Sequence, residues 1–329
     1  MTKLTTVLGE YPHVRPLLSG DVPLAGYAIE AIEVRPIISA YRRMIQALEF
    51  DICELAPVTY LMALQAGLAI TAIPVFLNRR FHHGDVQCAA GSGIAVPADL
   101  EGRRVGVRAY TVSTGVWVRG VLSEDYGVDI DAITWVVDDD DHIDGRTPGN
   151  VERVTDGRSL GELLRLAEID AALTGNAGTG RAGAPRPGWA AAAPSTPPPS
   201  ADDQAMRPYP LFEHADIIAR DWYLRTGIYP LHSVIALRAE LVERDPDLPT
   251  ALYAAFAESK RRHLAADPQW ATFPPLAQQS ALIAGDPIPY GPRSNDVSVT
   301  ALVRFARAQG LLDGLPGGRI FAAGDYPES

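Results

Sequence analysis

With 329 residues, the chain is long enough for two ordinary domains or for one large domain divided by a cleft. Hydrophobic residues make up 47% and charged residues 21%, which is typical of a globular protein. The formal net charge of -11 argues against a nucleic-acid partner, because it would repel a phosphate backbone. A few local Arg and His residues can still attract a small anion.

The cysteines and the N-terminal residues indicate the cellular compartment. Cys53 and Cys88 form no C-x-x-C pair, so neither a zinc site nor a redox motif is predicted. The first residues lead directly into an alternating, strand-like segment at 4–8, without an apolar signal core. No run of about 18 apolar residues occurs, so no membrane span is expected. We therefore expect a cytoplasmic protein.

Short β-like runs alternate with amphipathic helical stretches along the chain. Strands are predicted at residues 4–8, 28–34, 52–55, 70–75, 104–107, 133–137, 171–174 and 233–237. Helices are predicted at residues 37–48, 59–66, 114–126, 159–166, 249–265 and 297–308. Strands separated by helices imply crossover connections, so the predicted fold class is α/β with a largely parallel sheet.

The turn-rich stretch 94–107 is interpreted as the passage into a second lobe, with a return between 216 and 233. Lobe 1 is then predicted to contain residues 1–95 and 233–329, and lobe 2 residues 96–232. Such hinged architectures bind ligands where strand ends and helix N-termini meet. The Ala/Pro/Gly-rich stretch 175–205 is predicted to be a flexible insertion, either a lid or a tolerated loop.

An acidic run, Asp138–Asp141, follows the predicted strand at 133–137. It lacks the glycine turn and the terminal glutamate of a calcium loop. We expect a solvated acidic loop there, and no metal ligand is assigned.

Several blocks of sequence, taken together, resemble the 4,5-dihydroxyphthalate decarboxylase family. The specific ones are Glu54, the run Arg80-Phe81-His82-His83 and the stretch from Gly227 to His232. Supporting ones are Gly9-Glu10-Tyr11, residues 99–107, and Pro289-Tyr290-Gly291 with Asn295. The family is similar to the type II periplasmic-binding-protein fold in a cytosolic form. The resemblance covers most of the chain outside residues 140–208, and it implies two lobes, each a mainly parallel sheet flanked by helices, with a cleft between them.

Two departures from the family pattern concern the substrate rather than the fold. The family tends to carry Arg-His-Ser where this chain has His82-His83-Gly84. It also tends to place one more residue between the proline and the histidine than Pro230 and His232 allow.

Three residues are candidates for proton transfer. His232 lies at the edge of a predicted strand, and its family match favours a role in the cleft over a purely structural hydrogen bond. His83 follows a strand in a loop that also carries arginines, where it either faces solvent or contacts the ligand. Glu54 ends a buried run, so it either pairs with an arginine or donates a proton from a raised pKa.

The candidate substrate-binding residues are mostly cationic or lie at a helix start. Arg80 and its neighbour Arg79 match a carboxylate bidentately, and His82 is either a further contact or an exposed neighbour. Thr111, Ser113 and Thr114 are good N-cap residues, and the same helix N-terminus can hold a carboxylate. Tyr60 and Asn295 are candidates that the resemblance implies.

The resemblance implies non-oxidative decarboxylation of a hydroxylated aromatic acid such as 4,5-dihydroxyphthalate. A general acid protonates the ring carbon, and carbon dioxide leaves as aromaticity returns. No organic cofactor is required, because the substrate itself is the electron sink, and a role for a divalent metal stays open. The expected partners are a small anionic aromatic substrate and further copies of the chain, with neither nucleic acid nor membrane. The alternatives are a non-catalytic organic-anion-binding protein or a biosynthetic cleft enzyme acting on a related cyclic acid.

Overall fold

The computed structural model describes residues 1–143, 145–180, 207–314 and 319–329. The chain folds into two compact units. Unit 1 contains Met1–Arg80, Trp222–Arg307 and Leu312–Ser329, and unit 2 contains Phe81–Asp221 and Ala308–Leu311. Both ends of the chain therefore build unit 1, and most of its middle builds unit 2.

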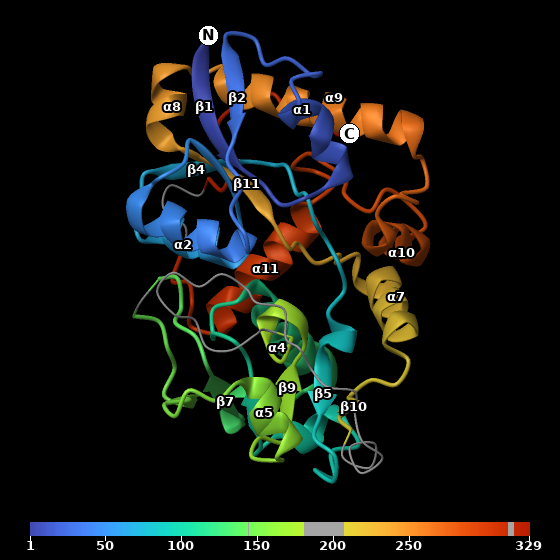
Figure 1. Cartoon of the computed structure of the whole chain (residues 1–329). Coiled ribbons are helices and arrows are strands. Elements are labelled where there is room, and N and C mark those ends of the chain that lie inside the picture. The colour runs from blue at the N-terminus through green and yellow to red at the C-terminus, as the bar shows by residue number, and fades with distance from the viewer. Residues whose placement is uncertain (144, 181–206, 315–318) are drawn as a thin grey trace. The chain divides into compact units, whose positions relative to one another are not determined.

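Unit 1 is built on a five-stranded sheet in the order β2-β1-β3-β11-β4 (Figure 1). Its strands are β1 (Thr2–Val7), β2 (Tyr27–Ala31), β3 (Ile52–Leu55), β4 (Ile70–Ile73) and β11 (Val234–Arg238). Its helical segments are η1 (Pro12–Val14), α1 (Arg15–Leu18), α2 (Ile37–Ala47), α3 (Pro57–Gln65), α8 (Ala239–Arg244), α9 (Leu248–Ala266) and α10 (Pro274–Ile283). Strand β1 runs parallel to β2 and β3, whereas β11 runs antiparallel to β3 and β4.

Unit 2 is built on a six-stranded sheet in the order β10-β5-β9-β6-β7-β8. Its strands are β5 (Val86–Cys88), β6 (Arg104–Gly106), β7 (Thr134–Val137), β8 (Val151–Arg153), β9 (Ala171–Leu173) and β10 (Tyr209–Pro210). Its helical segments are η2 (His83–Asp85), η3 (Pro97–Leu100), α4 (Ser113–Tyr126), η4 (Ile130–Ala132), α5 (Leu160–Arg165) and η5 (Gly175–Ala177). Helices α7 (Ala215–Thr226) and α11 (Asp296–Ala308) cross the division between the units.

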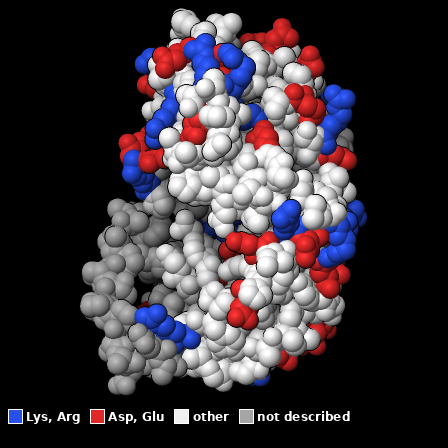
Figure 2. All heavy atoms as spheres, turned by 90° about the vertical axis from the view of Figure 1, so that its right-hand side faces the viewer, with Lys and Arg blue, Asp and Glu red and all other residues white. Residues whose placement is uncertain are grey.

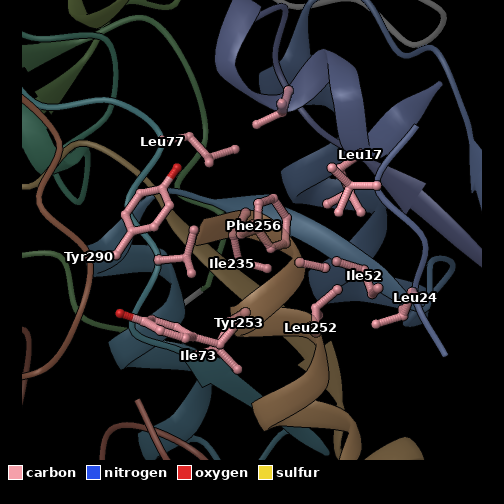
Figure 3. Close-up of a cluster of buried hydrophobic side chains, with 14 of the residues drawn as sticks. Leu17, Leu24, Ile52, Ile73, Leu77, Ile235, Leu252, Tyr253, Phe256 and Tyr290 are labelled. Carbon is pink, nitrogen blue, oxygen red and sulfur yellow. The ribbon is translucent and has the colours of Figure 1, made fainter. Parts of the chain in front are cut away.

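The main core of unit 1 lies between one face of its sheet and α9. Figure 3 shows Ile52, Ile73 and Ile235 from three strands packed with Leu252 and Phe256 from α9. All five side chains are buried. Burying such a side chain contributes about 1.5–3 kcal/mol, so this layer holds α9 firmly against the strands.

Two fold predictions need correction. The sheet of unit 1 is mixed rather than mainly parallel, because β11 brings the chain back beside the segment by which it left, as the bridge between Arg79 and Leu231 shows. In unit 2, β10 and β5 run antiparallel to their neighbours, whereas β9, β6, β7 and β8 are parallel. The predicted boundaries at 95/96 and 232/233 lie too late in the chain. Strand β5 already pairs with β9 in the second sheet, and Tyr229 already binds Arg79 of unit 1.

The predicted insertion at 175–205 lies outside the described residues from 181 onward, and Gly175–Ala177 forms η5. The acidic run is also different from its prediction, because Asp138 and Asp139 are buried. Asp139 forms an ion pair of 2.9 Å with the buried Arg108, which compensates the cost of its burial.

The surface carries charges of both signs. On the face shown in Figure 2, Asp and Glu side chains lie beside Lys and Arg side chains rather than in separate patches. Within the described part of the chain, no helix is long and apolar enough to cross a membrane.

Candidate functional site

The candidate residues of unit 1 gather at one edge of its sheet. Because β1, β3 and β4 share one direction and β11 runs against them, three strand ends and one strand start meet there. In open α/β sheets this carboxyl edge is where ligands bind. The residues at this edge, which we call the edge cluster, are Gly9, Tyr11, Glu54, Asn78, Arg79, Arg80, His232 and Ser233.

Glu54 is the centre of this edge. It lies on β3 opposite Ile235 of β11, and only 1% of its surface is exposed. The backbone N–H of Gly9 donates to its Oε2 at 2.7 Å, and the Tyr11 hydroxyl donates to its Oε1 at 2.8 Å. The Ser233 and Tyr41 hydroxyls add two more hydrogen bonds.

The direction of the Ser233 hydrogen bond follows from its other partners. Its Oγ accepts the backbone N–H groups of Leu77 and Asn78, both at 3.0 Å. The hydroxyl proton of Ser233 is therefore left to donate to Glu54. Four donors match the acceptor capacity of the ionised carboxylate, so when Glu54 is protonated one of these hydroxyls accepts its proton instead.

Burial and hydrogen bonding act on Glu54 in opposite directions. Burial raises the pKa of Glu54, because the charged form loses its hydration, while the hydrogen bonds from Gly9, Tyr11 and Ser233 lower it. Burial has the larger effect, so the pKa of Glu54 lies above that of an ordinary glutamate. A carboxyl of this kind keeps its proton to a higher pH and can serve as an acid.

His232 and Arg80 are half-buried and belong to the two chain segments that meet at this edge. The backbone N–H of His232 donates to the carbonyl of Asn78 at 3.1 Å, and the next residue, Ser233, binds Glu54. Arg80 follows Arg79, which bridges to Leu231. The structure thus brings three predicted residues, Glu54, His232 and Arg80, to one edge of one unit.

Arg79 and Asn295 are also brought together, but inside the protein. The Arg79 guanidinium is buried and donates to Asn295 Oδ1, to the carbonyl of Tyr229 and to Ser298 Oγ. It also lies 4.2 Å from the centre of the Tyr229 ring. Burial lowers the pKa of Arg79 to about 10, so it stays charged at neutral pH. These contacts hold the return of the chain against α11 rather than exposing a cation to a ligand.

Tyr60 is not part of the edge cluster. It is buried on α3, and its hydroxyl donates to the carbonyl of Ile320. Burial raises the pKa of Tyr60, which keeps this donor protonated. Tyr60 therefore fixes the C-terminal segment to unit 1.

The two adjacent histidines belong to unit 2 and are both buried, which excludes the alternatives of a solvent-facing His83 and an exposed His82. His82 Nδ1 lies 2.7 Å from Asp85 Oδ2. His83 is 3% exposed and packs between the rings of Phe81 and Phe212, at centroid distances of 6.5 and 6.0 Å. Burial lowers the pKa of His83 to about 4, so its ring is uncharged at neutral pH.

The start of α4 also lies in unit 2, at the edge where β6, β7 and β9 end. Its N-cap residue is Val112, without a side-chain cap, so the predicted capping by threonine or serine is wrong. The N–H and hydroxyl of Thr111 instead donate to Asp141 Oδ1, at 2.9 and 2.7 Å. A carboxylate of the protein thus already binds there, while Ser113 and Thr114 form the first turn of α4 and are buried.

Sequence reasoning missed the partners of Glu54. In the sequence, Tyr11 belongs only to a block of resemblance, and Ser233 only to the start of a predicted strand. Their positions relative to the strands could have identified them, because Tyr11 follows β1 and Ser233 precedes β11 at the same sheet edge. Among the residues that the structure describes, no group of three or more His, Cys, Asp or Glu side chains is placed to hold a metal ion.

Comparison with known proteins places the chain in a family. A 4,5-dihydroxyphthalate decarboxylase from Comamonas testosteroni is 33% identical over 274 residues, which cover 78% of this chain and 74% of that protein. One from Pseudomonas putida is 31% identical over 185 residues, 52% of this chain and 69% of that protein. The chain belongs to the 4,5-dihydroxyphthalate decarboxylase family. No family model matches it.

Membership of this family confirms the resemblance seen in the sequence, and it confirms the expectation of a carboxy-lyase at the level of the family. Solved structures confirm the fold. The aliphatic sulphonate-binding protein SsuA from Escherichia coli has a TM-score of 0.51 at 13% identity, covering 95% of this chain and 94% of that one. A ligand-binding component of an ABC-type import system from Staphylococcus aureus also has a TM-score of 0.51, at 12% identity, covering 98% and 97%. At these identities the likeness concerns the periplasmic-binding-protein fold alone.

Proposed function

We propose that this member of the decarboxylase family removes carbon dioxide from a hydroxylated aromatic carboxylic acid such as 4,5-dihydroxyphthalate. The observation that carries the proposal is the 33% identity to a 4,5-dihydroxyphthalate decarboxylase across 74% of that protein's length. The chemistry of the edge cluster in unit 1 supports it, because this reaction needs a proton source, a base and a cation.

The proton source is the feature that unit 1 provides most clearly. Replacing a carboxylate on an aromatic ring by hydrogen requires protonation of the ring carbon, and the electron pair of the broken C–C bond then returns to the ring. The Glu54 carboxyl, with its pKa raised by burial, retains a proton where an ordinary carboxyl would lose it. His83, with a pKa of about 4, is uncharged near neutral pH and so is not an imidazolium acid there.

The base and the cation come from the two half-buried residues beside Glu54. A hydroxyl on the ring loses its proton to His232, which increases the electron density at the carbon that bears the carboxylate. The guanidinium of Arg80 binds a substrate carboxylate, for which its planar fork is suited. Arg79 contributes no contact in this mechanism, because its guanidinium is buried and both of its terminal nitrogens are already bonded inside the protein.

The experiment that tests this function is incubation of the purified protein with 4,5-dihydroxyphthalate, with carbon dioxide and the ring product measured. We expect Glu54→Gln and His232→Ala to lower kcat by about 100-fold or more, which is the usual contribution of a general acid or base. The matched controls are Glu49→Gln and His214→Ala, because both side chains are exposed and neither residue belongs to the edge cluster.

The result separates catalysis from binding alone. Saturable binding of 4,5-dihydroxyphthalate without release of carbon dioxide would show an organic-anion-binding protein and refute the enzyme. Carbon dioxide release that survives both His232→Ala and Glu54→Gln would keep the reaction but refute the assignment of its residues.

A further inference from the structure

We propose that Tyr11 is the catalytic residue that delivers the proton of Glu54 to the substrate ring; this inference rests on the proposed function. Glu54 is 1% exposed and so cannot itself touch a ring carbon. A proton that starts on Glu54 must therefore pass through one of the groups that contact its carboxyl.

Elimination among these groups leaves one candidate. The N–H of Gly9 belongs to the backbone and does not exchange its proton during a reaction. The hydroxyls of Ser233 and Tyr41 are on buried side chains. Tyr11 has an exchangeable hydroxyl proton, its hydroxyl oxygen lies 2.8 Å from Oε1, and its side chain is only partly buried. Of the three partners that carry a hydroxyl, only Tyr11 has a side chain that is not fully buried.

The position of the Tyr11 ring is fixed on several sides, as a proton relay requires. The ring lies 5.5 Å from that of His13 and meets Phe273 edge-on at 6.0 Å. At Gly9 the backbone approaches so closely that a Cβ would lie 2.7 Å from Tyr11 Cε2. The Asn78 side chain adds a hydrogen bond to the Tyr11 hydroxyl. The ring contacts and the hydrogen bond from Asn78 together fix the Tyr11 hydroxyl beside Glu54.

The protons and electrons of the step balance. The Tyr11 hydroxyl gives its proton to the ring carbon, and the Tyr11 oxygen takes the proton of Glu54 in the same event. The C–C bond to the carboxylate breaks, carbon dioxide leaves, and the electron pair of that bond restores the aromatic ring. Burial and the nearby Glu54 charge raise the pKa of Tyr11 well above its usual value, which fits a residue that passes a proton without existing as a free tyrosinate. Glu54 ends as a carboxylate and regains a proton by the same route from water.

The test is Tyr11→Phe, which keeps the ring and removes only the hydroxyl. We expect kcat for carbon dioxide release to fall by about 100-fold or more, with KM changed less than about threefold. The matched control is Tyr27→Phe, because the Tyr27 hydroxyl also donates to a carboxylate, Asp245 Oδ2 at 2.7 Å, far from the edge cluster in the fold. This control should keep its full rate.

A second variant separates delivery of the proton from tuning of Glu54. Tyr41→Phe removes another donor to the same carboxyl, so it and Tyr11→Phe should both raise the pKa of Glu54. The infrared carbonyl band that disappears in Glu54→Gln reports this titration directly. If Tyr41→Phe lowers kcat as much as Tyr11→Phe, Tyr11 only tunes the carboxyl and the relay is wrong.

Two further outcomes are decisive. Fluorinated tyrosine at position 11 keeps the packing but lowers the pKa of the phenol. It should therefore change kcat while KM stays constant. An unchanged kcat overturns the relay even if Tyr11→Phe does not fold. An unmodified protein that releases no carbon dioxide refutes the proposed function, and the relay with it. A protein that is active and keeps its full kcat in Tyr11→Phe refutes the relay alone.

Discussion

Replacement of Arg79 by methionine distinguishes a structural cation from a substrate-binding one. The change leaves two acceptors without their Arg79 donor, Asn295 Oδ1 and the Tyr229 carbonyl, whereas Ser298 Oγ still accepts the N–H of Tyr229. An unsatisfied buried polar group costs about 1–3 kcal/mol. The lost contact of the guanidinium with the Tyr229 ring, at 4.2 Å, adds up to about 2 kcal/mol.

These costs are partly offset, because methionine fills similar space and the protein no longer has to bury a charge. We expect Arg79→Met to lower the free energy of unfolding by about 3 kcal/mol, a large share of the roughly 5–15 kcal/mol typical of a folded protein. The assay is urea unfolding followed by tryptophan fluorescence, since Trp222 and Trp270 are buried in unit 1. KM for the substrate should stay within about twofold in the folded variant.

Arg80→Met is the matched comparison, because Arg80 is the adjacent arginine but is half-buried. It should change the free energy of unfolding by less than about 1 kcal/mol and weaken substrate binding instead. An Arg79→Met variant that unfolds at the same urea concentration as the parent, with a raised KM, would show that Arg79 binds the substrate and that our reasoning from its burial is wrong.

Three other changes test separate features. Folding lowers the pKa of His83 to about 4. As the pH falls from about 6.5 to 4, the unfolded state takes up a proton that the native state does not, so the free energy of unfolding should decrease by about 3 kcal/mol. His83→Gln should remove that part of the pH dependence in urea titrations. Ala284 ends α10 in the left-handed region at a φ of 53° and is exposed, so Ala284→Gly should raise the free energy of unfolding by about 1 kcal/mol, and a destabilised variant would contradict this. Gly9→Ala places a Cβ 2.7 Å from Tyr11 Cε2 and 3.0 Å from Glu54 Oε2, so it should abolish most activity while circular dichroism stays unchanged; full activity would show that the ring can move without consequence.

The pattern of apolar residues predicted most of the longer elements. Residues 52–55 form β3 as predicted, and the helices at 37–48 and 249–265 appear as α2 and α9 with shifts of a residue or so at their ends. The pattern failed for β8 and β10, which have three and two residues, because a strand that short shows no measurable alternation. It also missed α7, where Ile217 and Leu224 are exposed and the apolar stripe is weak.

The sequence by itself determined the family, the fold class and the identity of Glu54, His232 and Arg80 as residues worth testing, because local patterns and blocks of resemblance are written in consecutive positions. Tertiary structure decided what each residue does. Two adjacent arginines differ in role because Arg79 meets its acceptors on segments about 150 and 216 positions away, whereas Arg80 does not share that buried environment. The pKa of Glu54 depends in the same way on donors that folding brings from Gly9 and Ser233, and burial and hydrogen bonding between such distant positions cannot be read from the order of the residues.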